Sequence, residues 1–317
     1  MTITAWALTT GETGMRTQAR GLAHAVADHV IEKTVPSRWR QVRGGVAPAD
    51  QLSPPWPDLL ITCGRRSVAR AIALRKASGG RTVTVHVQDP RGRRDAFDLV
   101  IAMGHDRIPA GGNVMKIATA LHDLTPENLA DAGRLWEARF HPLGRPLAGV
   151  VVGGDLKGRP FTLSDGARML AGLRRLRDEG ATSLAITPSR RTPATVRALF
   201  AQAFADDPRV FLWDLQGDNP YRAILALSDR LVVTSDSVSM VSEALSTPHP
   251  VEVFDLGFSR HVGFVQQLVD QGLIRRFDGE PAPPHTTGPI NATHQAANAV
   301  RALLRARTPQ ARTGVAG

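Results

Sequence analysis

Residues 234–245, TSDSVSMVSEAL, bring hydroxyl and carboxylate side chains directly after the apolar run ILALSDRLVV. Hydroxyls at the start of a helix can donate to a phosphate, and Glu243, inside the helix, can accept two hydrogen bonds from a ribose diol. Two simpler roles compete with this interpretation: Asp236 as the N-cap of the helix, and Glu243 as a solvent-facing charge. The segment indicates either a polar ligand site or a capped turn.

Two further loops carry groups that suit a diphosphate. They are 153–162, GGDLKGRPFT, and 187–193, TPSRRTP, and each follows an apolar run. The groups of interest are Gly153, Gly154, Lys157, Ser189 and Arg190. Glycines let a ligand approach the backbone, a helix N-terminus offers free N–H groups, and a guanidinium makes paired bonds to phosphate. An N-cap by Thr192 beside solvated arginines would explain the second loop alone. Two such loops after neighbouring strands favour a phosphate site.

Short apolar runs alternate with helical patterns along the chain, which predicts parallel α/β sheets. The strands expected are 3–9, 58–63, 83–87, 98–103, 147–154, 183–188, 210–214, 230–235 and 250–255. The helices expected between them are 17–30, 67–78, 165–180, 193–204, 219–228 and 238–246. Ligands bind at the carboxyl ends of such strands, so the loops described above would lie at one edge of a sheet.

The length of 317 residues predicts two domains. The helical stretch 125–146 ends in a Pro/Gly segment, which places the boundary near residue 145. The expected division is 1–145 for the acceptor-side domain, 146–305 for the nucleotide-sugar domain and 306–317 for a polar tail. The fold class expected is α/β, with two Rossmann-like doubly wound parallel sheets facing a cleft.

Amino-acid composition limits the classes of molecule that the protein is expected to bind. The formal net charge is +10, and only four of the 39 Lys and Arg residues are lysines. This excess reflects either a genome-wide bias toward arginine or attraction to anionic lipid, nucleic acid or a diphosphate. Aromatic residues make up 5%, which disfavours a base-stacking nucleic-acid binder. The single Cys63 excludes an internal disulfide, and no long apolar run predicts a spanning helix.

The motifs together resemble a known family. The serine-rich turn, the SEA helix and the following PVEVFDL are similar to the nucleotide-binding half of GT-B glycosyltransferases. More specifically, the chain is identified as a bacterial member of the family related to the plant mitochondrial-fission "elongated mitochondria" (ELM) proteins. The matching pieces are QDPR (88–91), FDLVIAMGHDR (97–107), GGDLK (153–157), ITPSRRT (186–192), WDLQGDNPY (213–221) and TSDSVSMVSEA (234–244). The turn TPHP at 247–250 departs from the TGKP-like turn of the family, so no lysine acts there.

The resemblance implies a donor site for a nucleotide-diphosphate sugar. Its diphosphate would contact the first two loops and the serines of the third, its ribose would bind the helix carboxylate, and GDNPY would meet the base edge. The residues so implied are Gly153, Gly154, Lys157, Ser189, Arg190, Asn219, Ser235, Ser237 and Glu243. Asn219 also suits a cap for the helix that Pro220 begins.

The acceptor side of an inverting transfer needs a general base in the first domain. Glu12, in the glycine-containing loop TTGETGMRTQ, and Asp89, in QDPR, are the catalytic candidates. Asp89 precedes a proline and can equally serve a turn. No metal-binding spacing is present, so no metal and no cofactor beyond the nucleotide sugar are expected.

The function expected is glycosyl transfer from a nucleotide-diphosphate sugar to a lipid-linked or envelope acceptor. The alternative is a non-catalytic ELM-type adaptor that binds a protein partner or a membrane. An NAD-dependent dehydrogenase is disfavoured because no GxGxxG follows the first strand. No nucleic-acid partner is expected. The location expected is cytoplasmic, either free or peripheral on an anionic membrane surface.

Overall fold

The computed structural model describes residues 2–35, 52–156, 158–178, 181–257, 259–280 and 288–307, and the chain folds as two compact units. Unit 1 comprises residues 1–123 with 291–317, and unit 2 comprises 124–290. Each unit contains a six-stranded sheet in which every strand pairing is parallel. The predicted α/β class with two parallel sheets is therefore confirmed.

The sheet of unit 1 has the order β2-β1-β3-β4-β5-β6. Its strands are β1 (Thr4–Thr9), β2 (His29–Thr34), β3 (Leu59–Cys63), β4 (Val83–Val87), β5 (Leu99–Met103) and β6 (Val114–Ile117). Its helices are α1 (Thr13–Val26), η2 (Arg65–Ser67), α3 (Val68–Ala77), η3 (Arg94–Ala96) and α10 (Ala292–Arg307).

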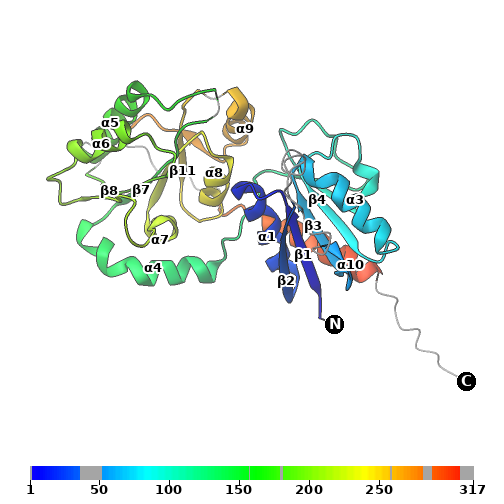
Figure 1. Ribbon diagram of the computed structural model, residues 1–317. Helices are drawn as coiled ribbons and strands as arrows, with labels where there is room; N and C mark the ends of the chain where they lie inside the picture. The colour runs from blue at the N-terminus through cyan, green and yellow to red at the C-terminus, as the bar shows by residue number, and fades with distance from the viewer. Residues whose placement is uncertain are drawn as a thin grey trace, which may run out of the picture. The chain divides into compact units, whose positions relative to one another are not determined.

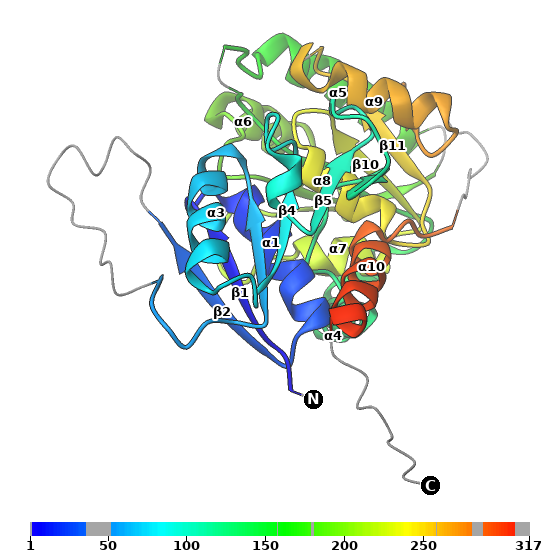
Figure 2. The same ribbon diagram turned by 90° about the vertical axis from the view of Figure 1, so that its right-hand side faces the viewer.

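Successive side chains of the strands in unit 1 point to opposite faces of the sheet, so a hydrophobic core forms on each face. Ala5 and Ala7 of β1 pack with α1 and α10, while Trp6 and Leu8 pack with α3. Helices α1 and α10 lie side by side on one face in both ribbon views, although they come from opposite ends of the chain (Figures 1 and 2). This packing places residues 291–307 with the first unit.

The sheet of unit 2 has the order β12-β11-β10-β7-β8-β9. Its strands are β7 (Leu147–Val152), β8 (Ser183–Pro188), β9 (Val210–Leu212), β10 (Arg230–Thr234), β11 (Val251–Phe254) and β12 (Arg275–Arg276). Its helices are α4 (Pro126–Phe140), η4 (His141–Leu143), α5 (Leu163–Asp178), α6 (Ala194–Ala203), α7 (Tyr221–Leu227), α8 (Val238–Leu245) and α9 (Ser259–Asp270).

Both faces of the second sheet are covered, as a doubly wound fold requires. Leu147 and Val151 of β7 belong to the core formed with α4, α7, α8 and α9. Val150 and Val152 belong to the core formed with α5 and α6 on the opposite face. Figure 1 shows α5 and α6 on one side of the strands and α4 and α7 on the other. The order of strands reverses between β7 and β10, and ligands of such folds bind at the carboxyl ends of the strands flanking this point.

The structure differs from the sequence prediction in several elements. The helix expected over 17–30 ends at Val26, because His29–Thr34 form the edge strand β2. Strand β2 has exposed and half-buried side chains and pairs only with β1, so its hydropathy pattern is weak. The edge strands β6 and β12 and the helices α9 and α10 were not predicted.

The observed units also divide the chain at 123/124 and 290/291, whereas the sequence division lies near 145. Helix α4 packs against α7, which places residues 126–140 in unit 2.

Candidate functional site

A cavity of about 380 Å³ lies at the carboxyl edge of the second sheet. Strands β7 and β8 end in it, the loop after β9 forms its rim, and α7 and α8 contribute its walls. The lining residues that carry polar or aromatic groups are Thr187, Ser189, Arg190, Trp213, Asn219 and Tyr221. The volume is within the range of roughly 300–1,000 Å³ that is usual for small-molecule sites.

Arg190 is the principal cationic group of this cavity. Its side chain is exposed, and it makes no hydrogen bond or ion pair within the described part of the chain. The adjacent Arg191 turns elsewhere: it donates to the Asp236 carboxylate at 2.9 Å and to the Asp155 carbonyl at 3.1 Å. The charge of Arg190 is therefore available to an anion, while that of Arg191 is compensated inside the protein.

The loop that contains these arginines is held by Thr192. Its hydroxyl accepts from the Ser189 N–H at 2.9 Å and donates to the Val152 carbonyl at 3.1 Å. The loop between β8 and α6 is thus fastened to the end of β7, and Ser189 and Arg190 project from a fixed backbone. Thr192 is therefore not the N-cap of α6, a position that Pro193 occupies; its hydroxyl instead joins two strand-end loops.

Asp236 occupies the position where the strand order reverses. Its side chain is fully buried and accepts hydrogen bonds from the Gly154 N–H at 3.0 Å and the Thr234 hydroxyl at 2.6 Å, in addition to the Arg191 bond. Asp236 is not the N-cap of α8, because Ser237 accepts from the Met240 N–H at 3.3 Å. Asp236 therefore closes a network between the ends of β7, β8 and β10.

The two glycines after β7 are required by this network. A Cβ atom on Gly153 would lie 2.0 Å from an Asp236 oxygen, and one on Gly154 would lie 2.0 Å from the Arg191 carbonyl oxygen. The Gly153 N–H donates to Thr234 at 2.8 Å, and the Gly154 N–H donates to Asp236. Both amides thus bind protein groups, and neither glycine lines the cavity. Lys157, expected beside them, lies outside the described residues.

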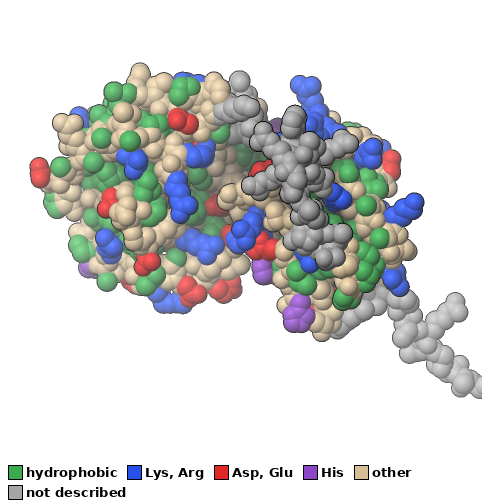
Figure 3. Space-filling view, viewed as in Figure 1, with side chains coloured by type: hydrophobic (Ala, Val, Ile, Leu, Met, Phe, Trp, Pro, Cys, Tyr) green, Lys and Arg blue, Asp and Glu red, His purple; other side chains and the backbone are tan. Residues whose placement is uncertain are grey.

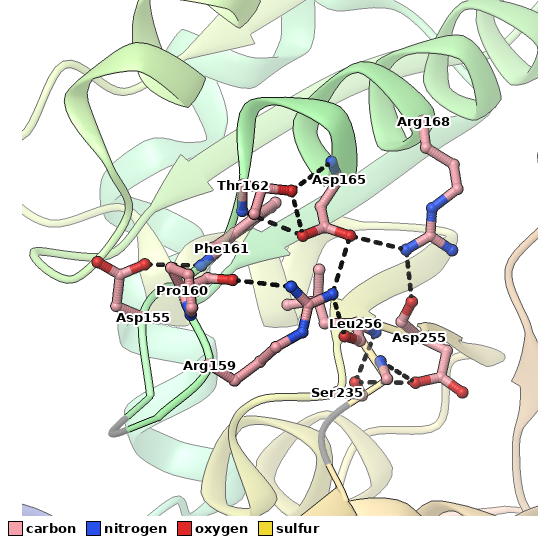
Figure 4. Close-up of polar contacts among 11 residues, drawn as sticks. Asp155, Arg159, Pro160, Phe161, Thr162, Asp165, Arg168, Ser235, Asp255 and Leu256 are labelled. Atoms are coloured by element: carbon pink, nitrogen blue, oxygen red, sulfur yellow. Dashed lines mark hydrogen bonds and ion pairs between the residues drawn. The ribbon is translucent and has the colours of Figure 1, made fainter.

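A second polar network holds the loop after these glycines (Figure 4). Arg159 donates to the Leu256 carbonyl at 3.1 Å and contacts Asp165 at 3.4 Å, while Arg168 donates to the Asp255 carbonyl at 2.9 Å. Burial raises the pKa of Asp165, but hydrogen bonds from Thr162 and the positive charges of the two arginines bring it below its ordinary value. This network connects α5 to the loop after β11, outside the lining of the cavity.

The serines of the third loop also have structural partners. Ser235 is buried and accepts from the Leu256 N–H at 2.9 Å, which joins the end of β10 to that of β11. Ser237 caps α8. Neither side chain lines the cavity, although α8 borders it through Met240.

The segment GDNPY (217–221) and Glu243 are joined by a hydrogen bond. Tyr221 lines the cavity and donates its hydroxyl to the Glu243 carboxylate at 2.5 Å. Asn219 accepts from the Tyr221 N–H at 2.9 Å, which fixes the start of α7. Glu243 is half-buried and does not itself line the cavity, to which it is connected through its bond with Tyr221.

The loop between β9 and α7 contains lining residues that were not proposed from the sequence, namely Trp213, Leu215 and Gly217. The Trp213 indole donates to the Gln216 carbonyl at 2.7 Å, and Leu215 has a φ of +71°, a left-handed value rare for leucine. The signal within WDLQGDNPY that could have identified them is the presence of an aromatic and an aliphatic residue shortly before the polar turn GDNP.

The catalytic candidates belong to unit 1. Glu12 precedes α1 and accepts from the Thr10 hydroxyl at 2.5 Å and from Arg66 at 3.0 Å. Burial raises its pKa, but the Thr10 bond, its own backbone N–H and the Arg66 charge together bring the pKa below its ordinary value. Asp89 accepts from the Arg91 N–H at 2.7 Å and so stabilises its turn. Glu12 is accordingly an ionised carboxylate at neutral pH.

On the face shown in Figure 3, Lys and Arg side chains are spread over both units with acidic side chains among them.

Among the described residues, no group of three His, Cys, Asp or Glu side chains could hold a metal ion. None of the helices described is both long and apolar enough to cross a bilayer.

Comparison with solved structures shows the fold. UDP-GlcNAc 2-epimerase from Methanocaldococcus jannaschii superimposes with a TM-score of 0.57 at 10% identity, covering 96% of this chain and 100% of that one. The Neisseria meningitidis UDP-GlcNAc 2-epimerase bound to UDP-GlcNAc gives a TM-score of 0.51 at 12% identity, with 96% and 100% covered. Both share the fold of this chain, two Rossmann-type α/β units in one polypeptide.

Comparison with protein sequences shows the family. Mitochondrial fission protein ELM1 of Arabidopsis thaliana is 31% identical over 279 residues, which cover 79% of this chain and 65% of that protein. A Rickettsia prowazekii protein called RP120 is 25% identical over 288 residues, covering 78% of this chain and 80% of its own. The chain therefore spans just under two thirds of the plant relative. Residues 13–304 match the family described as Mitochondrial fission ELM1, and the chain belongs to that family.

Proposed function

We propose that unit 2 binds a nucleoside-diphosphate sugar in the cavity at its carboxyl edge and that the protein transfers the sugar to an acceptor hydroxyl. The observation that carries this proposal is Arg190, an uncompensated guanidinium among the described residues, which lines the cavity with Ser189 beside the reversal of strand order. A guanidinium and a hydroxyl on a fixed loop match the charge and the acceptor oxygens of a diphosphate.

The other groups suit the rest of a nucleotide. The first turn of α8 borders the cavity through Met240, whose N–H is already bound by the capping Ser237 hydroxyl, so α8 contributes an apolar side chain to the wall. Trp213 and Leu215 offer an apolar surface for a base. The Glu243 carboxylate, held by Tyr221, offers acceptor oxygens for a ribose diol.

This proposal changes the roles of several expected residues. In this proposal Gly153, Gly154 and Ser235 shape the site through their hydrogen bonds with Thr234, Asp236 and Leu256 respectively, and they do not contact the ligand. Ser237 caps α8. Ser189, Arg190, Asn219 and Glu243 remain the proposed ligand-binding residues, and Lys157 remains a prediction.

The fold of UDP-GlcNAc 2-epimerases supports a nucleotide-sugar ligand, since one of these structures is described as bound to UDP-GlcNAc. In the transfer we propose, the acceptor oxygen bonds to the anomeric carbon while the bond from that carbon to the diphosphate breaks. The nucleoside diphosphate leaves with the electron pair, and the hydroxyl proton passes to a carboxylate. Glu12, which is ionised at neutral pH, is the proposed proton acceptor.

A second candidate function is that of an adaptor, and the name of the plant relative, a mitochondrial fission protein, favours it. An adaptor of this fold would retain the cavity without turnover. Catalysis and binding must therefore be measured separately.

The test begins by measuring the melting temperature of the protein in the presence of UDP, GDP, ADP or CMP and of the corresponding sugar donors. A ligand at ten times its Kd stabilises the folded state by about 1.4 kcal/mol. Release of nucleoside diphosphate with an acceptor present would establish transfer, whereas a sugar that stays on the nucleotide with altered stereochemistry would indicate epimerisation. Binding without either product would favour the adaptor. Absence of binding by every nucleotide would contradict the proposal.

The acceptor is proposed to be carried by a lipid or by an anionic envelope surface. Arginines in the strand-end loops of unit 1 would make such contact, but two of them are engaged: Arg16 pairs with Glu32 and Arg66 pairs with Glu12. Arg65 has no ion pair within the described residues. Salt-sensitive sedimentation with anionic vesicles would support surface contact, and its absence would restrict the acceptor to soluble molecules.

A further inference from the structure

A second cavity, of about 430 Å³, lies within unit 1 at the amino-terminal edge of its sheet. Ile3 precedes β1, Val83 begins β4, and both contribute apolar side chains to the wall. Val26, the last residue of α1, and Leu304 of α10 add two more. Because Glu12 and Asp89 follow the carboxyl ends of parallel strands, this cavity is at the opposite edge from both. It is not part of the proposed catalytic edge.

Four arginines surround the apolar wall, namely Arg81, Arg301, Arg305 and Arg307. Asp58 is the acidic residue of the lining, and its carboxylate accepts from the Thr4 N–H at 2.9 Å. The lining therefore has an excess of positive charge around an aliphatic interior.

Three of these arginines have no carboxylate partner among the described residues. Arg301 donates to the Ala25 carbonyl and to the Asn298 side chain, which are both neutral acceptors. Arg81 donates to the Ser78 carbonyl at 3.1 Å. Arg305 is exposed and makes no hydrogen bond or ion pair with a described residue. Arg307, by contrast, pairs with Asp98.

We propose that this cavity binds an amphiphilic anion, a single aliphatic chain that ends in a carboxylate or a phosphate. The aliphatic wall would cover the chain, and the uncompensated guanidiniums, Arg305 foremost, would bind the head group. The volume falls in the usual range of roughly 300–1,000 Å³ for small-molecule sites. A nucleotide fits less well, because none of the described residues that line the cavity has an aromatic side chain to stack on a base.

The test uses the full chain and sodium dodecanoate at concentrations below those that form micelles, with binding measured by calorimetry. Dodecyl phosphate should also bind, because the head groups share the chemistry that an arginine recognises. 1-Decanol, which lacks the charge, should bind more weakly than sodium decanoate, an anion of the same chain length measured in the same way. Equal binding of the alcohol and the acid, or no binding of any of the anions, would overturn the proposal.

Variants locate the site. Arg305→Gln should weaken dodecanoate binding about tenfold by removing charge-assisted bonds. Leu304→Trp should fill the cavity with an apolar ring and abolish binding. Arg70→Gln, which removes an exposed charge from α3 in the same unit, should leave binding unchanged. Equal affinities for wild type and the two cavity variants would contradict the site.

A final experiment distinguishes binding of one amphiphile in the cavity from attraction of the protein to an anionic membrane surface. Anionic vesicles that sediment the protein when free dodecanoate fails to bind would place the basic groups at a membrane and overturn the proposal. Dodecanoate binding that persists with Glu12→Gln and Arg190→Gln would show that this cavity is independent of the proposed transfer site.

Discussion

The hydroxyl of Tyr221 donates to the carboxylate of Glu243 at 2.5 Å and so joins the first residue of α7 to the middle of α8. Tyr221 also lines the cavity at the carboxyl edge of the second sheet. The bond restrains the carboxylate that we propose as the ribose acceptor, so the two side chains should act as a pair.

Glu243→Gln should lower nucleotide affinity about tenfold or more, because a charge-assisted hydrogen bond is worth about 1.5–3 kcal/mol. Tyr221→Phe should have a smaller effect through loss of positioning alone. The double variant should lose less affinity than the two single losses added together, because the side chains are coupled. Titration calorimetry would measure all three. Unchanged nucleotide affinity in Glu243→Gln would mean that Glu243 is a charge on the helix surface with no role in binding.

The neighbouring arginines of the loop after β8 provide a matched pair. Arg190→Gln should lower nucleotide affinity at least about tenfold while leaving the free energy of unfolding within about 0.5 kcal/mol of wild type. Arg191→Gln should instead lower the free energy of unfolding by about 1–3 kcal/mol, because it leaves the buried Asp236 without its cation. Urea unfolding and nucleotide titration of both proteins decide the matter. A reversed pattern would mean that Arg191 is the ligand-binding residue.

Removing the carboxylate at the strand reversal should destabilise the protein. Asp236→Ala leaves the Gly154 N–H and the Thr234 hydroxyl without their acceptor, and it should lower the free energy of unfolding by about 3 kcal/mol. Gly153→Ala should also destabilise, since its Cβ would lie 2.0 Å from an Asp236 oxygen. In the double variant this clash is gone, so the two losses should not add. Full stability of Asp236→Ala in urea would argue against a structural network.

The buried His86 should make the stability depend on pH. Burial lowers its pKa to about 4, against a smaller opposing effect of the Asp89 charge. The unfolded chain binds the proton near pH 6.5 and the folded protein does not, so stability falls as pH drops from about 6.5 to about 4. The loss due to this residue should be about 3 kcal/mol across that range.

His86→Phe should make this dependence shallower, because phenylalanine retains a ring beside Phe97 without a titrating group. A smaller slope should remain, since burial also lowers the pKa of His105 and of His249. His294→Gln, which changes an exposed histidine on α10, serves as the control and should preserve the wild-type dependence. Urea unfolding at intervals from pH 7 to about pH 4.5 would measure the slopes, since carboxylates with lowered pKa values add their own loss only at lower pH. Parallel slopes for wild type and His86→Phe would contradict the assignment.

The sequence determined the features that depend on neighbouring residues. Strand cores such as 83–87 and 183–188 and the loops that follow them were predicted because apolar runs and turn residues are local signals. Ser189, Arg190 and Asn219 were proposed from those loops, and the structure shows that they line one cavity. The family was recognisable from the same segments.

The tertiary structure decided which polar groups are available to a ligand. Asp236 and Arg191 are 45 residues apart in the chain, and their ion pair compensates the charge of Arg191. The adjacent Arg190 makes no hydrogen bond or ion pair with a described residue, so its charge is available to a ligand. Gly153 and Gly154 looked like phosphate donors until their N–H groups were seen to bind Thr234 and Asp236.

The same holds for α10, whose Arg301 reaches the carbonyl of Ala25, 276 residues away. Hydrogen bonds and packing between distant segments depend on how the chain returns to itself, and residue type or periodicity does not specify that return. The sequence thus identified the chemical groups, and only the fold showed which of them the protein uses for its own stability.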